Sequence, residues 1–210
     1  MNVEVLFEDE WMIVVDKPSG LLSVPGKGVA GEDSVVSRVL SSRLGVIDHP
    51  AVHRLDMDTS GILMLAKTRD AHRHLSCQFQ EGRVQKFYIA LLDGMVADDE
   101  GVIELKFRLD VENRPYQIYD EVHGKLGVTH WKKLEVKGGM TRVEFSPKTG
   151  RTHQLRVHSA DKRGLGCPIM GDTLYGGHLR HGELKLHAAR LICEHPVLGE
   201  RLCLEAPVPF

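Results

Sequence analysis

The feature that most constrains the fold is a pair of strand-length segments joined by a short glycine turn. Residues 128–136 and 140–145 are rich in β-branched and aromatic side chains, and Lys137, Gly138 and Gly139 connect them. Glycines in so short a connection are typical of a β-hairpin, because a tight turn needs residues that tolerate positive φ. The sequence therefore predicts antiparallel pairing in this part of the chain.

Other short apolar runs bounded by turn residues predict further strands. They cover residues 3–7, 12–15, 62–66, 84–92, 186–192 and 201–205. Helical spacing of apolar side chains or a helix-capping residue predicts helices over 33–44, between Thr68 and Gly82, and over 152–160. Because strands outnumber helices and several are joined by hairpins, we expect an α+β fold with a mixed, largely antiparallel central sheet and flanking helices.

The size and composition of the chain suit a globular protein. Its 210 residues are 42% apolar and 27% charged, which fits one domain or two small ones. We expect one domain over residues 1–210, and a two-lobed sheet with a cleft between the lobes is compatible with that. The first residues lack the pattern of a signal peptide, and no apolar run approaches the roughly 20 residues that span a bilayer. We therefore expect a cytoplasmic protein.

Cysteine and histidine usage argues against a metal site. The four cysteines, Cys77, Cys167, Cys193 and Cys203, are widely spaced and form no CxxC pair. Reduced, buried thiols explain them better than a disulfide framework or a zinc site. The twelve histidines include no HExxH pattern, the arrangement that binds zinc in many metalloproteases. We expect no metal ion.

The net charge of −2 does not by itself indicate a nucleic-acid-binding protein. A local positive field can nevertheless exist within a nearly neutral chain. Basic residues gather in two groups, one with Lys67, Arg69, Arg73, Arg83 and Lys86 and one with Lys148, Arg151, Arg156, Lys162 and Arg163. Two solvated faces and one basic cleft made of both groups are both compatible with this distribution.

A run of polar residues lies immediately before the apolar segment 62–66. Its spacing from Asp56 and Asp58 to Gly61 imitates the start of a calcium-binding loop. The twelfth position of such a loop needs a bidentate glutamate, and here it is Lys67, so calcium binding is excluded. Two interpretations remain: a turn in which the aspartates cap backbone amides, and a functional carboxylate at the end of a strand.

A second concentration of polar residues is the segment GRTHQLRVH at 150–158. If this segment is helical, arginine and histidine side chains point from several faces, which is costly in a core that lacks anionic partners. Either Asp56 or the phosphates of a bound RNA would provide such partners. An ordinary surface helix is the alternative.

Six segments, taken in order, resemble the motifs of the RluA-type pseudouridine synthases. They are residues 16–25 (DKPSGLLSVP), 53–61 (HRLDMDTSG), 86–88 (KFY), 150–158 (GRTHQLRVH), 168–176 (PIMGDTLYG) and 186–189 (LHAA). The segments at 53–61 and 150–158 are the most specific, and the six together span nearly the whole chain. The connection 159–166 is longer than is usual in the family.

The resemblance implies the pseudouridine synthase fold, with a catalytic cleft, and an isomerase that converts uridine in RNA to pseudouridine. This rearrangement involves no net redox change, and the resemblance implies neither a cofactor nor a metal. The segment at Asn113, Arg114 and Pro115 resembles the short subgroup, which lacks an N-terminal S4 domain. That subgroup acts on the tRNA anticodon stem-loop, on 23S ribosomal RNA, or on both. We expect a single catalytic domain over 1–210 that is a monomer without an obligatory protein partner.

Three residues carry the implied chemistry. Asp56 is the implied catalytic carboxylate, acting as nucleophile or base. Arg151 is its implied partner, because a guanidinium can bind a carboxylate through two parallel hydrogen bonds. Tyr88 is implied to stack on the uracil ring, and its hydroxyl is a candidate acceptor of the C5 proton.

Four further residues are implied to contact RNA: Arg54, His53, Lys86 and Arg156. The target uridine must leave its stack before chemistry can occur, at a cost of a few kcal/mol. Arg54 is implied to occupy the space that the flipped base leaves, because its planar guanidinium can stack while its donors bond to neighbouring bases.

Two other classes of protein stay open beside the synthase. A catalytically silent RNA-binding relative would not need Asp56, Tyr88 and Arg151 together. A nuclease would usually need several carboxylates around a metal ion, and Asp56 with Asp58 offers too few.

Overall fold

The computed structural model describes residues 3–26, 28, 31–176 and 182–210 of the chain. The chain divides into two compact units. The first contains Met1–Lys86 and His187–Pro209, and the second contains Phe87–Leu186 together with Phe210. The single catalytic domain expected from the sequence stays a prediction.

The first unit is organised around a strand that is buried along its whole length. Its strands are β1 (Glu4–Glu8), β2 (Met12–Lys17), β3 (Ser60–Ala66), β9 (Leu186–Glu194) and β10 (Arg201–Glu205). β2 is antiparallel to both β1 and β3, β3 is parallel to β9, and β10 is antiparallel to β9. Every residue of β3 is buried, which fits its continuous apolar sequence, because a strand covered on both faces has no solvent side.

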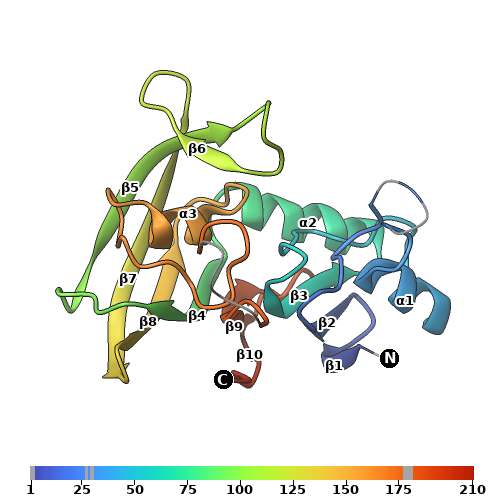
Figure 1. Cartoon of the computed structure of the whole chain (residues 1–210). Helices are drawn as coiled ribbons and strands as arrows, with labels where there is room; N and C mark the ends of the chain where they lie inside the picture. Colours follow the sequence, from blue (N-terminus) through green and yellow to red (C-terminus); the bar gives the residue numbers. More distant parts are fainter. Residues whose placement is uncertain (1–2, 27, 29–30, 177–181) are drawn as a thin grey trace. The chain divides into compact units, whose positions relative to one another are not determined.

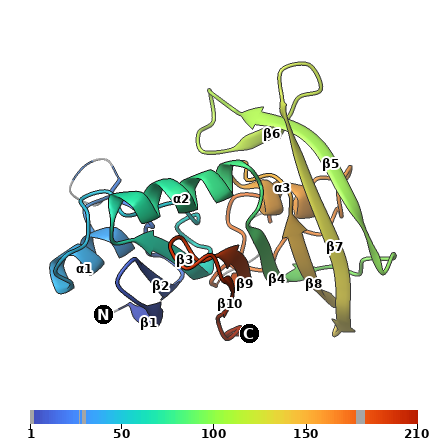
Figure 2. The same ribbon diagram turned by 180° about the vertical axis from the view of Figure 1, so that it is seen from behind.

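Two helices belong to the same unit, α1 (Val35–Ser42) and α2 (Arg69–Gln80). α2 begins where the sequence predicts it, since the Thr68 hydroxyl accepts a hydrogen bond from the amide of Ala71 at 3.2 Å. The buried side chains Ala71 and Leu75 pack with Met64 of β3 in one apolar cluster. α2 consequently lies alongside β3 (Figures 1 and 2).

Gly61 allows β3 to approach β9 closely. Its φ is +107°, and a Cβ added to it would lie 2.4 Å from the carbonyl oxygen of Ala188 in β9. Only glycine combines this backbone conformation with so little space. The chain therefore needs glycine at the point where the polar segment 53–59 enters the buried strand.

The second unit is built on antiparallel strands. They are β4 (Gln85–Asp93), β5 (Glu100–Leu109), β6 (Gln117–Tyr119), β7 (Lys125–Lys137) and β8 (Met140–Pro147). Their order is β4-β8-β7-β5-β6. Figure 1 shows β5 and β7 running side by side as long curved strands, with the short β6 at one end of β5.

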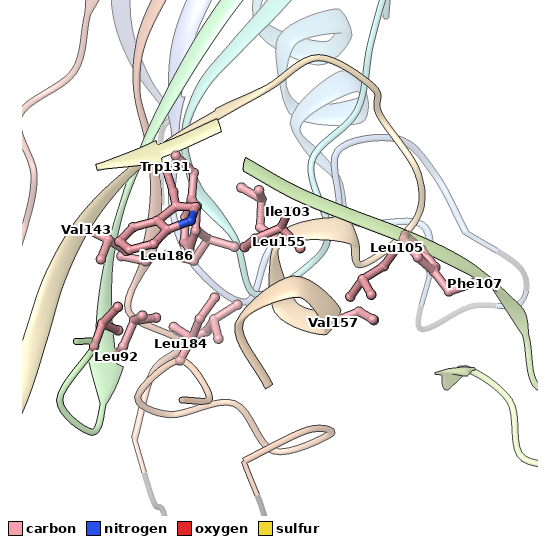
Figure 3. Packing of buried hydrophobic residues seen from close by; sticks show 14 residues of the cluster. Leu92, Ile103, Leu105, Phe107, Trp131, Val143, Leu155, Val157, Leu184 and Leu186 are labelled. Carbon is pink, nitrogen blue, oxygen red and sulfur yellow. The ribbon is translucent and has the colours of Figure 1, made fainter. Parts of the chain in front are cut away.

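The core of the second unit lies between these strands and the short helix α3 (Gln154–Ala160). Leu155 and Val157 of α3 point toward β5, where Leu105 and Phe107 are buried (Figure 3). Trp131 of β7 belongs to the same cluster. The motif at 150–158 thus contributes apolar side chains to a core as well as polar ones, which explains its mixed composition.

The structure confirms the α+β class, and each predicted strand and helix has a counterpart with adjusted ends. The predicted hairpin is β7–β8, and Gly138 and Gly139 both have positive φ. The third helix begins at Gln154 instead of residue 152, because the backbone of His153 is left-handed with φ of 55°. β5 and β6 lie where the sequence analysis predicted no element.

Within the described part of the chain, no helix is long and apolar enough to cross a membrane.

Candidate active site

Asp56 lies in the connection that leads into β3. It is partly buried, while Leu55 before it is buried and Arg54 is exposed. The amide of Thr59 donates a hydrogen bond to the carbonyl of Asp56 at 3.1 Å, which closes a tight turn over residues 56–59. The segment therefore places the Asp56 carboxylate and the Arg54 guanidinium just before a fully buried strand.

Lys17 at the end of β2 lies beneath this turn. Its side chain is fully buried, and its ammonium donates to the carbonyls of Pro18, Leu21 and Met57 at 2.9, 2.7 and 2.7 Å. An ammonium has three N–H donors, so all of them are used. The Lys17 side chain thereby connects β2 to the turn that carries Asp56.

Burial lowers the pKa of Lys17 to about 8, and the charges of Asp58, Asp56 and Asp16 oppose that shift. Sequence reasoning gave Lys17 no role. The available signal was a lysine that ends the apolar run MIVVDK, a position where a charged side chain needs specific partners.

His53 contacts two elements of its own unit. Its Nε2 atom accepts a hydrogen bond from the amide of Met64 at 3.0 Å, and its ring stacks on Phe79 of α2 with centroids 4.5 Å apart. Burial, together with the positive charge of Lys86, lowers the pKa of His53 to about 3. The imidazole is therefore neutral near pH 7 and connects the motif at 53–61 to β3 and α2. Its contact with RNA stays a prediction.

Ser60 and His187 join the start of β3 to the start of β9. The Ser60 hydroxyl and the His187 Nδ1 atom are 2.9 Å apart, and both side chains are buried. The Nε2 atom of His187 has no hydrogen-bond partner among the described residues. Burial lowers the pKa of His187, which favours the neutral ring in this pair.

Tyr88 and Arg151 both belong to the second unit. Tyr88 is on β4, opposite Phe145 of β8, and is partly buried against the core. Arg151 precedes α3 and is exposed, and its Nε atom donates to the carbonyl of Leu126 at 3.3 Å. The guanidinium of Arg151 is thus at the surface of its unit.

Gln154 organises the backbone around Arg151. Its side-chain oxygen accepts hydrogen bonds from the Arg151 amide at 3.0 Å and from the Thr149 hydroxyl at 2.8 Å. Its side-chain nitrogen donates to the Val128 carbonyl and the Thr129 hydroxyl at 3.1 and 2.9 Å. Sequence reasoning missed this role, because helical spacing alone does not show that a glutamine at the first turn reaches a strand.

Arg156 is 3% exposed and pairs with the fully buried Asp172 through two hydrogen bonds of 2.9 and 2.6 Å. Its guanidinium also lies 5.4 Å from the ring centre of Tyr175. Asp172 is thus an anionic partner for the motif at 150–158 that the sequence analysis did not consider. Contact between Arg156 and RNA stays a prediction, and it would require this buried pair to open.

The seven predicted site residues are divided between the two units. Arg54, His53, Asp56 and Lys86 belong to the first, and Tyr88, Arg151 and Arg156 belong to the second. Parts of the first basic group are paired, Lys67 with Glu8 and Arg83 with Glu81. Among the residues that the structure describes, no group of three His, Cys, Asp or Glu side chains could hold a metal ion.

Comparison with known proteins identifies what the chain is similar to. The family model described as RNA pseudouridylate synthase matches residues 11–161. A protein of Yersinia pestis named dual-specificity RNA pseudouridine synthase RluA is 41% identical, covering 98% of this chain and 99% of its own. The protein of that name from Haemophilus ducreyi is 43% identical over 99% of this chain and 94% of its own.

Two solved structures are also similar. Human RNA pseudouridylate synthase domain containing 1 has a TM-score of 0.78 and 28% identity, covering 100% of this chain and 84% of the other. Human RNA pseudouridylate synthase domain containing 4 has a TM-score of 0.76 and 26% identity, covering 98% and 88%.

Proposed function

We propose a catalytic assignment for this chain from the premise that it belongs to the RNA pseudouridylate synthase family. The chain is an RNA uridine isomerase, which converts uridine to pseudouridine. In this reaction the N1–C1′ bond of uridine breaks and a C5–C1′ bond forms, so the atoms of substrate and product are the same. The open question is which side chains perform these steps.

Asp56 is the catalytic carboxylate in this proposal. The observation that carries the assignment is the turn at 56–59, which holds a partly buried carboxylate close enough to the Lys17 ammonium for their charges to interact. A carboxylate beside a buried ammonium in a partly buried turn is a candidate catalytic group. It attacks the sugar, attacks the base or removes a sugar proton, and each of these routes begins from the ionised form.

Tyr88 and Arg151 complete the proposed catalytic set. Tyr88 stacks on the target uracil, and its oxygen takes the proton released from C5 as its own O–H proton passes to solvent, since the side chain offers both a ring face and an oxygen. Arg151 supplies the positive charge of the proposed set, because a guanidinium can bind a carboxylate through two parallel donors. The exposed guanidinium of Arg151 is compatible with such a partner.

The proposed substrate is a structured RNA from which one uridine is flipped out. Exposed Arg54, two residues before Asp56, fills the vacated space in the stack. His53, Lys86 and Arg156 complete the proposed RNA contacts. The proposed substrates are the tRNA anticodon stem-loop and 23S ribosomal RNA, which the motif resemblance implies. The relatives named dual-specificity RNA pseudouridine synthases support action on more than one RNA. The proposed enzyme works in the cytoplasm as a monomer, without metal or cofactor.

The test uses tRNA and 23S RNA fragments that carry tritium at C5 of uridine. The expected result is release of tritium in a chelating buffer, with pseudouridine in the product and no strand cleavage. Strand cleavage would favour a nuclease, and binding without tritium release would favour a silent RNA-binding protein.

The variant Asp56→Asn tests the assignment of the carboxylate. Asparagine has nearly the same shape but cannot carry the negative charge, so we expect tritium release to fall by at least about 10⁴-fold, as when an essential catalytic group is removed. RNA affinity should stay within about threefold, or about 0.7 kcal/mol. Near-normal turnover by Asp56→Asn would refute the assignment.

A further inference from the structure

The four carbonyls of the segment 55–58 all accept hydrogen bonds. The carbonyl of Asp56 is bound within the turn by Thr59. The other three are bound by the segment 17–23, which the sequence analysis singled out only by resemblance. The donors are the Ser23 hydroxyl to Leu55 at 2.8 Å, the Gly20 amide and Lys17 ammonium to Met57 at 3.0 and 2.7 Å, and the Ser19 hydroxyl to Asp58 at 2.8 Å.

Ser23 binds both backbone polar groups of the residue before Asp56. Its hydroxyl donates to the Leu55 carbonyl at 2.8 Å and accepts from the Leu55 amide at 3.0 Å. Ser23 is 3% exposed, and Leu55 is also buried, so water has little access to replace these bonds. The orientation of the peptide that leads into Asp56 therefore depends on one hydroxyl.

Ser23 is itself held by the start of α1. The amide of Val36 donates to the Ser23 carbonyl at 3.3 Å, and Leu22 forms a parallel bridge with Ser34, the N-cap of α1. Both contacts are made by backbone groups, and the Ser34 side chain takes no part in them.

Ser19 binds the other side of the turn. Its hydroxyl donates to the carbonyl of Asp58, two residues after Asp56. Gly20 follows with φ of +80°, the conformation that brings its amide to the Met57 carbonyl. Ser19 is only partly buried, so its side chain has space for a small addition.

We infer that Ser19 and Ser23 are positioning residues, which fix the carboxylate of Asp56 by binding the carbonyls on either side of it. This inference rests on the proposed catalytic role of Asp56. Both hydroxyls donate to backbone carbonyls of the segment 55–58. Each acts through the backbone of the turn, and displacement of a catalytic group by about 1 Å can reduce a rate on the order of 100-fold.

The experiment compares Ser23→Ala, Ser19→Ala and Ser19→Thr with the full-length wild-type protein. The measured quantities are the single-turnover rate of tritium release and the Kd for the same RNA. We expect each alanine variant to lose about 10- to 100-fold in rate, with Kd changed less than about threefold. Ser19→Thr keeps the hydroxyl and should recover most of the rate, which a purely space-filling role would not predict.

Ser34→Ala is the matched control. Ser34 is a fully buried serine in the same unit whose hydroxyl caps α1 and does not bind the segment 55–58. It should lower the melting temperature as Ser23→Ala does, yet leave the single-turnover rate within about threefold of wild type.

Two outcomes would overturn the inference. One is a single-turnover rate within twofold of wild type in both Ser23→Ala and Ser19→Ala. The other is an equal loss of rate in Ser34→Ala, which would make the effect one of general stability. If Ser23→Ala does not fold, the comparison of Ser19→Ala with Ser19→Thr tests the inference alone. A wild-type protein that releases no tritium would instead reject the proposed function.

Discussion

Gly61 is a residue at which backbone conformation and space both demand glycine. We expect Gly61→Ala to lower the free energy of unfolding by roughly 3 kcal/mol or more, because positive-φ strain adds to a collision with the Ala188 carbonyl. Urea unfolding followed by circular dichroism measures this loss. Gly82→Ala is the control, since Gly82 has φ of +71° but nothing within 4 Å of its added Cβ. Equal losses of unfolding free energy in the two variants would contradict a steric collision at Gly61.

His158 of α3 makes stability depend on pH. It is fully buried against Phe107, and neither ring nitrogen has a hydrogen-bond partner within the described ranges. Burial lowers the pKa of His158 to about 4, although the charge of Asp161 opposes this. Since the unfolded chain has the ordinary pKa near 6.5, it binds the proton first as pH falls. The stabilising contribution is complete above about pH 6.5 and is lost between there and about pH 4.

The size of this effect follows from the same linkage. Between pH 8 and pH 5 the wild-type protein should lose on the order of 2 kcal/mol of unfolding free energy through His158. His158→Leu removes the titrating group, so its stability should vary less over this range by about that amount. Chemical denaturation at the two pH values measures the difference, and parallel pH profiles for both proteins would contradict it.

Among the helices and strands, the features that the sequence predicted are those that depend on neighbouring residues. The β7–β8 hairpin was predictable from Gly138 and Gly139, and the start of α2 from Thr68. The sequence of β5 also has a strand pattern, because the buried residues Ile103, Leu105 and Phe107 recur with a period of two. The parallel pairing of β3 with β9 joins residues far apart in the sequence, and no local pattern specifies it.

The attachment of α3 to β7 depends on one side chain. Gln154 is 4% exposed, and its amide binds Val128 and Thr129 of β7 and the Arg151 amide. Gln154→Leu has nearly the same volume but leaves these buried groups without a partner, so we expect a loss of about 2 to 3 kcal/mol in unfolding free energy. The rate should also fall if Arg151 is catalytic. Thermal unfolding and tritium release measure the two effects.

A matched control for this variant is Gln80→Leu, at the exposed end of α2. It makes the same chemical change on a surface, where water satisfies the polar groups, so stability should change by less than about 0.5 kcal/mol. An equally small effect in Gln154→Leu would show that water replaces the glutamine in the interior as well.

At the scale of the whole molecule, the sequence predicted the family but not how its motifs are stabilised. The motifs at 53–61 and 150–158 carried the resemblance, and the family match confirms it. The buried partners, Lys17 for the first motif and Asp172 for the second, come from distant segments. Such pairs depend on long-range folding, and composition shows only that buried charges need partners somewhere.

Measurements of RNA affinity can separate the effect of particular basic residues from the effect of the net charge of the protein. The protein has a net charge of −2, so attraction to RNA must come from particular basic residues. Lys86→Gln and Arg38→Gln each remove one positive charge and change the net charge from −2 to −3, because −2 − 1 = −3. Lys86 is a proposed RNA contact, whereas Arg38 of α1 pairs with Asp33 and has no proposed role in binding.

The measurement is the affinity for RNA over a range of salt concentrations. Each lysine that neutralises a phosphate releases a counterion, so losing it reduces the slope of log Kd against log salt by about 0.7 to 0.9. We expect that reduction in Lys86→Gln and an unchanged slope in Arg38→Gln. Equal changes would mean that net charge governs binding, and no change in either would remove Lys86 from the proposed RNA contacts.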